Sequence, residues 1–417
     1  MLTSWLSICI IISMKKRREK ISWKKFTHGI ITGAADNDPS GITTYSIVGA
    51  TTGLTQLWLV PLATPLLINI QSLCAKIGDV KKQGLAQITK EIYGKKLSVA
   101  ILLLLITANT ATLGANFAAI AASLKLVFPG IDLLFVLPLI ALFIWFVIVF
   151  NSYHSFSKIL ALLSLVFVSY VITGIKVQPD WGEVITRTFI PTITFSGKYF
   201  IAAVGFLGTT IAPYLFYWQV TQEIEDKPTV KDANYEFSQN SLGFIISNTI
   251  SYFIIITTAN LFFSQGQSIN TAADAAAALR PLAGPMSEIL FAIGIIGSGL
   301  LAIPVLAAVN SYAISETFGW KKGLNHKPNK AKGFYSALSA AFLCGLAISL
   351  SSISPIKALF YSQVFNGFLT PFLIIIILLL VNNPKVIGKY TTPLWQNVLG
   401  WLTTAIMFFA IIGIFVS

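Results

Sequence analysis

The sequence predicts an all-α membrane protein with eleven transmembrane helices, and three observations lead to this fold class. Of the 417 residues, 55% are hydrophobic and only 11% are charged, whereas a soluble domain carries about 25% charged residues. Charge-free stretches long enough for a membrane helix recur along the whole chain. Lysines and arginines gather in alternate loops. Together these features exclude a soluble enzyme, a nucleic-acid-binding protein and a disordered scaffold.

The intervals without charged residues set the bounds of the expected spans. Between the second and third spans, Leu85, Ile88 and Ile92 share one helical face with lysines on the other, which predicts an interfacial amphipathic helix or a solvated linker. The spans are expected at 28–51, 54–76, 97–126, 131–151, 156–176, 198–220, 239–263, 286–316, 334–352, 356–382 and 393–416.

The basic residues predict the orientation. The net charge is +13, and lysine-rich or arginine-rich segments precede the first span and follow the second, eighth and tenth. All four segments share one side if the N-terminus is cytoplasmic, as the positive-inside rule requires, and the C-terminus is then extracellular or periplasmic. The apolar residues 1–13 are too short to span, so we expect either Met14 to be the true start or an interfacial anchor.

The first expected span is interrupted near its middle. Asp36 and Asp38 lie within apolar sequence, and Pro39, Ser40 and Gly41 follow at once. A carboxylate at this depth is costly unless it is paired, hydrated or bound to a cation. Proline disfavours helix at the preceding residue, so the helix should break here and line a cavity.

The sixth expected span carries a matching interruption, a Gly-Thr-Thr stretch followed by Pro213. The two breaks lie in the first helix of two consecutive sets of five spans, 1–5 and 6–10. Because five is an odd number, the second set starts from the opposite side of the membrane and is inverted relative to the first. Paired broken helices in inverted halves point to a site near the membrane midplane. The division predicted from this is a cytoplasmic segment 1–27, a first repeat 28–176, an extracellular loop 177–197, a second repeat 198–382, and a linker with the eleventh helix, 383–417.

The groups near the breaks are hard oxygen donors. Besides the two aspartates, the candidates are the side chains of Asn37, Ser40, Thr209 and Thr210 and the carbonyls of Ala35 and Ala212. Neither break contains methionine, cysteine or histidine. Oxygen-only sites suit Mg²⁺, Ca²⁺ or Mn²⁺, and a single carboxylate with few direct ligands fits Mg²⁺ best, because that ion sheds water reluctantly.

The motif GAADNDPSGITTYS resembles the first helix of the Nramp divalent-metal transporters, and GTTIAPYLFYWQ resembles their sixth. The resemblance covers roughly residues 22–416 and implies a leucine-transporter-type fold. The family's usual first-helix motif is Asp-Pro-Gly-Asn. Asp38 matches its aspartate, whereas Gly41 stands at the position of its asparagine, which is a metal ligand in the family. The usual sixth-helix motif is Met-Pro-His, which here reads Ala212-Pro213-Tyr214, and a further family histidine corresponds to Gln219.

Further departures lie in the third and ninth spans. The acidic residues of the family's proton path fall near Leu113 and Asn116, and the ninth span has no arginine where the family has a pair. This pattern resembles the Nramp-related magnesium transporter branch. The resemblance to that branch implies a wider site that accepts largely hydrated Mg²⁺, also carries Mn²⁺ and lacks proton coupling.

We therefore expect uptake of Mg²⁺, with Mn²⁺ tolerated, by alternating access without proton coupling. The alternatives are a proton-coupled Mn²⁺/Fe²⁺ transporter of the same family and a Na⁺-coupled organic-solute symporter. We expect no enzyme activity, no cofactor besides the transported metal, no nucleic-acid partner, and a monomer in the lipid bilayer of the cell membrane. The expected metal site comprises Asp38, Ala35, Thr209 and Ala212, with Asp36, Asn37, Ser40, Gly41, Thr210, Tyr214 and Asn366 as possible further lining. An interhelical hydrogen bond is the other interpretation of Asn366.

Overall fold

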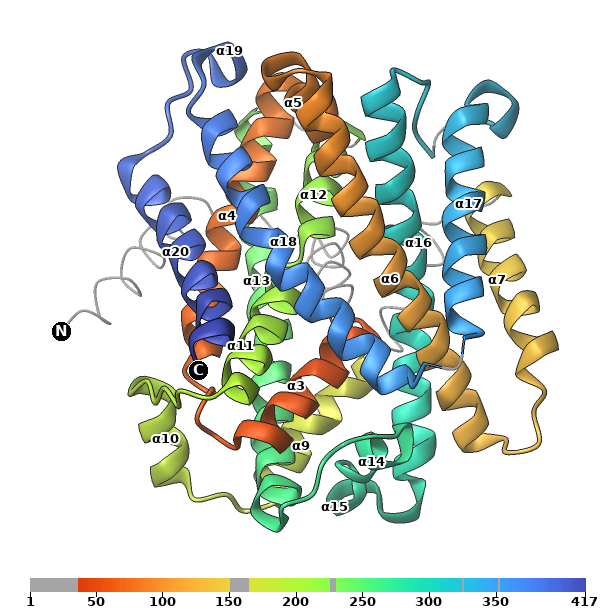
Figure 1. The fold of residues 1–417 in the computed structure, drawn as a ribbon, viewed down its shortest axis with the longest axis vertical. Helices are drawn as coiled ribbons and strands as arrows, with labels where there is room; N and C mark the ends of the chain where they lie inside the picture. The colour runs from red at the N-terminus through yellow and green to blue at the C-terminus, as the bar shows by residue number, and fades with distance from the viewer. Residues whose placement is uncertain (1–36, 151–164, 226–229, 325, 352) are drawn as a thin grey trace.

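The computed structural model describes residues 37–150, 165–225, 230–324, 326–351 and 353–417 as a bundle of helices (Figure 1). Within these ranges there is no strand, which confirms the all-α class. The α-helices are α3 (Pro39–Thr52), α4 (Leu59–Lys81), α5 (Leu85–Tyr93), α6 (Lys95–Val127), α7 (Leu133–Phe150), α9 (Ser169–Lys176), α10 (Trp181–Phe189), α11 (Gly197–Thr210), α12 (Pro213–Glu225), α13 (Val230–Leu261), α14 (Ala272–Ala277), α15 (Arg280–Ala283), α16 (Ser287–Phe318), α17 (Lys332–Ser349), α18 (Pro355–Val381), α19 (Pro384–Ile387) and α20 (Leu394–Val416).

Nine spans among the described residues are long and apolar enough to cross a membrane. They match the second to fourth and the sixth to eleventh predicted spans; the third, expected at 97–126, is observed as Lys95–Val127. The first and fifth predicted spans extend into residues outside the described ranges, so the count of eleven stays a prediction. Side chains on α7 such as Leu134, Phe135 and Leu139 are more than 60% exposed, which favours lipid around the bundle.

The long helices pack as two groups. The first contains α3, α4, α11, α12 and α13, in which α3 packs on α11 and α13 while α12 packs on α4. The second contains α6, α7, α16 and α17, centred on the contact between α6 and α16. Between them runs α18, which contacts α3 and α11 on one side and α6 on the other, and α20 packs outside against α18 and α11.

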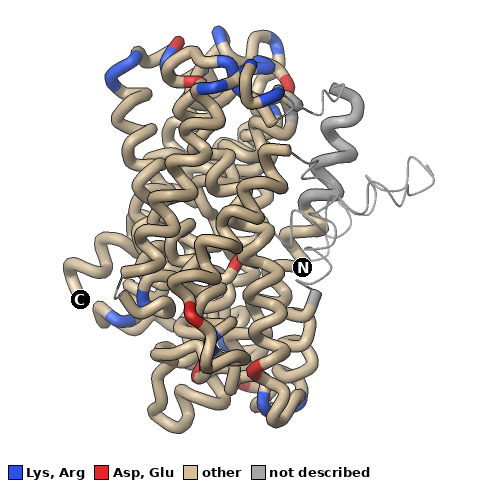
Figure 2. Tube along the Cα trace, turned by 90° about the vertical axis from the view of Figure 1, so that its right-hand side faces the viewer, with Lys and Arg blue, Asp and Glu red and all other residues tan. Residues whose placement is uncertain are grey.

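The segment after the second span is an amphipathic helix, one of the two alternatives that the sequence left open. On α5, Leu85, Ala86, Ile88 and Thr89 are buried against α6 and α16. This helix lies at the same end of the bundle as α19 (Figure 1). Lysines gather densely at this end in Figure 2, as predicted for the loops after the second, eighth and tenth spans. At the opposite end lie α10, α14 and α15.

Candidate metal site at two helix breaks

Asp38 caps the N-terminus of α3. Its backbone is extended (φ −72°, ψ 168°), and Pro39 occupies the first helical turn, where a missing N–H costs nothing. The backbone N–H of Gly41 donates to Oδ1 of Asp38 at 2.7 Å. A helix therefore begins at the predicted break. Ala35 and Asp36, also predicted at the site, lie outside the described residues.

Neutral donors surround the Asp38 carboxylate. The hydroxyl of Ser40 lies 2.6 Å from Oδ1 and 2.7 Å from Oδ2, and Nδ2 of Asn116 on α6 donates to Oδ2 at 3.0 Å. Asp38 is only 2% exposed, yet the ion pairs within the described chain involve Asp79, Glu183 and Glu316 instead. Among the described residues this carboxyl group is therefore held by hydrogen bonds and makes no ion pair, so a cationic ligand would supply the missing counter-charge.

The sixth span is also broken as predicted. The helix α11 ends at Thr210 and α12 begins at Pro213, and Ile211 has non-helical angles (φ −113°, ψ 58°). The carbonyl of Ile211 accepts from Oγ1 of Thr370 on α18 at 3.2 Å. The carbonyl of Ala212 accepts from the N–H of Leu215 at 3.1 Å. This uses one of its two lone pairs and leaves the other for a ligand.

Thr210 holds the two broken helices together. Its hydroxyl lies 3.0 Å from the hydroxyl of Tyr45 on α3 and donates to the carbonyl of Phe206 at 2.8 Å. These bonds give Thr210 a structural role in this conformation. The neighbouring Thr209 and the predicted Tyr214 are both buried, each 4% exposed.

A chain of amides extends from the first break onto α18. Nε2 of Gln363 donates to the hydroxyl of Ser40 at 2.7 Å. Nδ2 of Asn366 lies 3.1 Å from Oε1 of Gln363 and 3.3 Å from the hydroxyl of Thr112 on α6. Asn366 therefore makes the interhelical hydrogen bond that the sequence allowed, and it does so within the network around Asp38.

The prediction of site residues missed Gln363 and Thr112 and placed Asn116 only by family comparison. The spacing of polar residues along α6 and α18 could have indicated these site residues. Polar residues recur at i, i+3 and i+7 on each of two long helices, which places each set on one helical face. The sets are Asn109, Thr112 and Asn116 on α6, and Gln363, Asn366 and Thr370 on α18.

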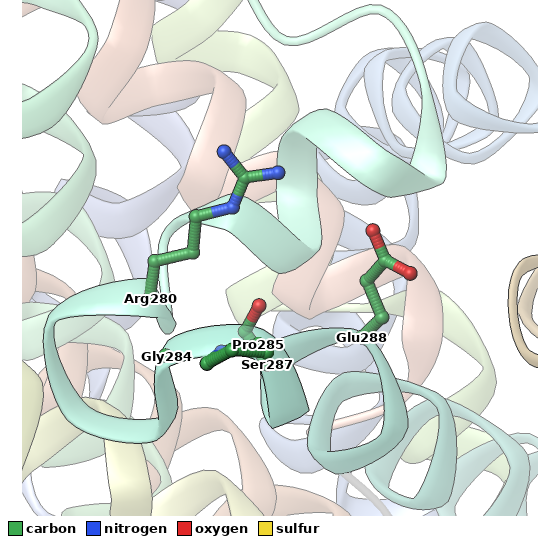
Figure 3. A pocket seen from close by; sticks show the side chains of 5 residues that line it. All are labelled: Arg280, Gly284, Pro285, Ser287 and Glu288. Carbon is green, nitrogen blue, oxygen red and sulfur yellow. The ribbon is translucent and has the colours of Figure 1, made fainter.

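The oxygen donors that the structure describes near the breaks are the carboxylate of Asp38 and neutral oxygens. In the part of the chain that the structure describes, no three His, Cys, Asp or Glu side chains cluster to hold a metal. A pocket of about 440 Å³ lies elsewhere, at the end of the bundle where α15 leads into α16 (Figure 3). Arg280 and Glu288 line it together with Gly284, Pro285 and Ser287. None of the predicted site residues belongs to this pocket, and those that the structure describes, such as Asp38, Thr209 and Ala212, are buried.

Comparison with known proteins identifies the family of this chain. The family model described as natural resistance-associated macrophage protein-like (Nramp) matches residues 29–417. This chain belongs to the Nramp family. The divalent metal cation transporter MntH of Bacillus subtilis is 26% identical over 387 residues, covering 90% of this chain and 88% of the relative. MntH of Staphylococcus saprophyticus is 27% identical over 416 residues, covering 93% and 91%. These Nramp relatives are named as transporters and not as enzymes.

Solved structures share the fold of this Nramp chain. The manganese transporter of Eremococcus coleocola superposes with a TM-score of 0.71 at 19% identity, covering 94% of this chain and 87% of that one. The transporter MhsT, solved with L-phenylalanine, gives a TM-score of 0.60 at 17% identity, with coverage of 96% and 99%. The fold class predicted from the inverted repeat is therefore confirmed, whereas these likenesses carry no information on the substrate.

Proposed function

We propose that this Nramp protein is a divalent metal cation transporter that takes up Mg²⁺, tolerates Mn²⁺, works by alternating access and is not coupled to protons. The observation that carries the proposal is the buried carboxylate of Asp38, held by neutral donors where α3 begins and beside the α11–α12 break. The family relatives named MntH support the class of substrate. The metal site proposed here keeps Asp38, Ala35, Thr209 and Ala212 as predicted.

Two features favour Mg²⁺ over a softer metal. The described polar groups that hydrogen-bond to Asp38 contain only oxygen and amide nitrogen, and they include the hydroxyl of Ser40 and the side-chain amide of Asn116. Ala212 precedes Pro213 where the family usually has methionine, so a thioether ligand is missing from that position. Thioether and imidazole groups suit softer transition metals, whereas oxygen ligands suit Mg²⁺ and Mn²⁺.

The membrane potential alone provides enough free energy to drive Mg²⁺ uptake without proton coupling. A membrane potential of about 100 mV contributes about 2.3 kcal/mol per charge, hence about 4.6 kcal/mol for a divalent cation. That corresponds to roughly a thousandfold concentration gradient. The described donors to Asp38 are a hydroxyl, a backbone N–H and an amide, and none of these groups exchanges a proton with a carboxylate near neutral pH.

The proposed topology follows from the basic residues. The N-terminal segment 1–27 is cytoplasmic, the C-terminus is extracellular or periplasmic, and the protein is a monomer in the cell membrane. The second repeat, 198–382, is inverted relative to the first, 28–176, the extracellular loop 177–197 lies between them in the chain, and residues 383–417 add a linker and the eleventh helix. Support comes from the lysine-rich end of the bundle, which carries α5 and α19 (Figure 2).

The test is uptake by purified protein in liposomes that contain a fluorescent Mg²⁺ indicator, under an inside-negative potential. We expect Asp38→Ala to abolish uptake and to remove Mg²⁺ binding in isothermal titration. Asp180→Ala is the matched control, because Asp180 also caps a helix but lies exposed on α10. Undiminished uptake by Asp38→Ala would remove Asp38 from the site.

A second candidate is a proton-coupled Mn²⁺/Fe²⁺ transporter of the same family, since the relatives are named divalent metal cation transporters without further specification. A pH-sensitive dye inside the same liposomes separates the two functions. We expect no acidification during Mg²⁺ or Mn²⁺ uptake, whereas a coupled transporter acidifies the interior in proportion to metal entry. A Na⁺-coupled organic-solute symporter would instead require Na⁺ and bind no divalent metal.

A further inference from the structure

We propose that the pocket where α15 leads into α16 binds the headgroup of a membrane lipid that carries both a phosphate and a primary ammonium group, as phosphatidylethanolamine does. Arg280 binds the phosphate in this arrangement, and Glu288 binds the ammonium group. The pocket lies apart from the two helix breaks, and none of the predicted metal-site residues lines it. The inference is therefore independent of which ion the protein transports.

Two opposite charges line this pocket without neutralising each other. Figure 3 shows the side chains of Arg280 and Glu288 on opposite flanks of the turn formed by residues 284–287, and both extend to the same side of that turn. Among the described residues, neither of these two side chains makes an ion pair or a hydrogen bond. The pocket therefore offers a positive and a negative position at once, which is the complement of a zwitterion and not of a simple ion.

The pocket lies at the level expected for lipid headgroups. The stretch that is long and apolar enough to cross the membrane runs from Arg280 to Phe318. After Glu288, no charged residue follows in the sequence until Glu316. Glu288 therefore marks the boundary between charged and apolar sequence on α16. Because charged side chains avoid the hydrocarbon core, this boundary is where the headgroup region begins.

An exposed apolar face of α16 continues from the pocket toward the middle of the helix. Met286, Ile289 and Ile293 are 62%, 42% and 41% exposed. They are spaced by three and four positions, so they lie on one side of the helix. Acyl chains can pack on this face while the headgroup occupies the pocket. A water-soluble phosphoethanolamine ester would leave the face uncovered, and for this reason we assign the pocket to a lipid.

The two charged groups predict which headgroup is preferred. The pocket has a volume of about 440 Å³, and a Cβ atom at Gly284 would meet nothing within 4 Å, so a headgroup has room. A guanidinium group binds a phosphate through two parallel hydrogen bonds. The carboxylate of Glu288 accepts hydrogen bonds from a primary ammonium group, whereas the glycerol of phosphatidylglycerol brings no positive charge to it. Phosphatidylethanolamine should therefore bind more tightly than phosphatidylglycerol.

The test is native mass spectrometry of the full-length protein in detergent, with phosphatidylethanolamine and phosphatidylglycerol of the same acyl chains added at equal concentration. We expect the wild type to bind phosphatidylethanolamine about fivefold more tightly. Arg280→Ala should weaken the binding of both lipids about fivefold, because both carry the phosphate. Glu288→Gln should weaken only phosphatidylethanolamine. Arg187→Ala is the matched control: Arg187 lies on α10 at the same end of the bundle but pairs with Glu183 at 3.4 Å, so its loss should leave lipid binding unchanged.

Three results would overturn the proposal. The first is equal binding of the two lipids by the wild type. The second is undiminished binding of phosphatidylethanolamine by either Arg280→Ala or Glu288→Gln, which would assign the bound lipid to non-specific contacts around the bundle. The third is displacement of the lipid by an equal concentration of glycerophosphoethanolamine, the soluble headgroup without acyl chains, which would assign the pocket to a soluble ligand. Tm values of the variants equal to that of the wild type show that a loss of binding is not a loss of folding.

Discussion

Asn116, on α6, donates a 3.0 Å hydrogen bond from Nδ2 to Oδ2 of Asp38, the residue that caps α3. The bond joins the two helix groups of the bundle, because α6 packs with α16 and α17 whereas α3 packs with α11 and α13. In an alternating-access transporter such groups move against each other. The carboxylate that we propose as the metal ligand is therefore also a contact between the two groups.

Replacing Asn116 with aspartate should make uptake pH-dependent. Asn116→Asp places a second carboxylate beside Asp38, and two carboxylates at this separation cannot both ionise but share a proton. The cation must then displace that proton. We expect Mg²⁺ uptake by the variant to fall as the pH is lowered from about 8 to about 6, while wild-type uptake changes little. Liposome assays over this range measure it, and parallel pH profiles of the two proteins would contradict the interpretation.

Gly208 permits the close approach of α11 to α18. A Cβ atom there would collide with backbone atoms of Gln363 and Gly367, which cannot rotate away. We expect Gly208→Ala to separate the helices and to destabilise the protein by about 1–3 kcal/mol, seen as a lower Tm in detergent. Gly130→Ala is the control, because a Cβ at Gly130 meets open space. Equal Tm values for the two variants would show that the packing of α11 on α18 does not require a glycine at position 208.

Glu316 caps the amphipathic helix α5 from a neighbouring helix. Its carboxylate, on α16, accepts from the N–H of Ala86 at 3.1 Å and pairs with Lys322 at 2.8 Å. Gly84, the residue before α5, provides no side-chain cap, and a Cβ there would collide with this carboxylate. Removing a cap costs about 1 kcal/mol.

We therefore expect Glu316→Leu to speed hydrogen exchange of residues 85–93 by roughly fivefold. Mass spectrometry of the intact protein in detergent measures it. Glu91→Gln, on the exposed side of the same helix, is the control and should leave the exchange unchanged. If both variants exchange like the wild type, α5 does not depend on the cap.

Asp274 should make the short helix α14 sensitive to acid. Burial opposes its ionisation, but hydrogen bonds from the backbone N–H groups of Asn270 and Thr271 outweigh this and hold the pKa of Asp274 below its ordinary value of 3.8. A carboxyl with a lowered pKa in the folded state stabilises above its unfolded pKa, and this stability is lost as the pH falls through the folded value.

The exchange protection of residues 272–277 should consequently drop below about pH 3.8 in the wild type. In Asp274→Asn it should already be low at neutral pH and should show no such transition. Comparing the two proteins at each pH cancels the intrinsic pH dependence of exchange. A transition of the same size in both would assign the acid sensitivity to another group.

The helix breaks could be predicted from local chemistry. Pro39 and Pro213 lack an N–H and restrict the preceding residue, so both helices begin at these prolines. The apolar face of α5 could likewise be predicted from the spacing of Leu85, Ile88 and Ile92. These features depend on residues that are close in the sequence.

The amide network could not be predicted in this way. The contacts of Asn116 with Asp38 and of Gln363 with Ser40 join residues 78 and 323 positions apart. Which faces of α6 and α18 meet α3 depends on the packing of the whole bundle. The spacing of the polar residues on α6 and α18 places each set on one helical face, but it does not say which neighbours that face meets.

The most direct test of the central claim is anomalous X-ray diffraction from crystals of this protein soaked with Mn²⁺. We predict a manganese peak beside the carboxylate of Asp38, between the start of α3 and the break from Ile211 to Ala212, and its loss in Asp38→Ala crystals. A peak at a distant position, or one that persists in Asp38→Ala, would contradict the claim that this carboxylate holds the transported ion.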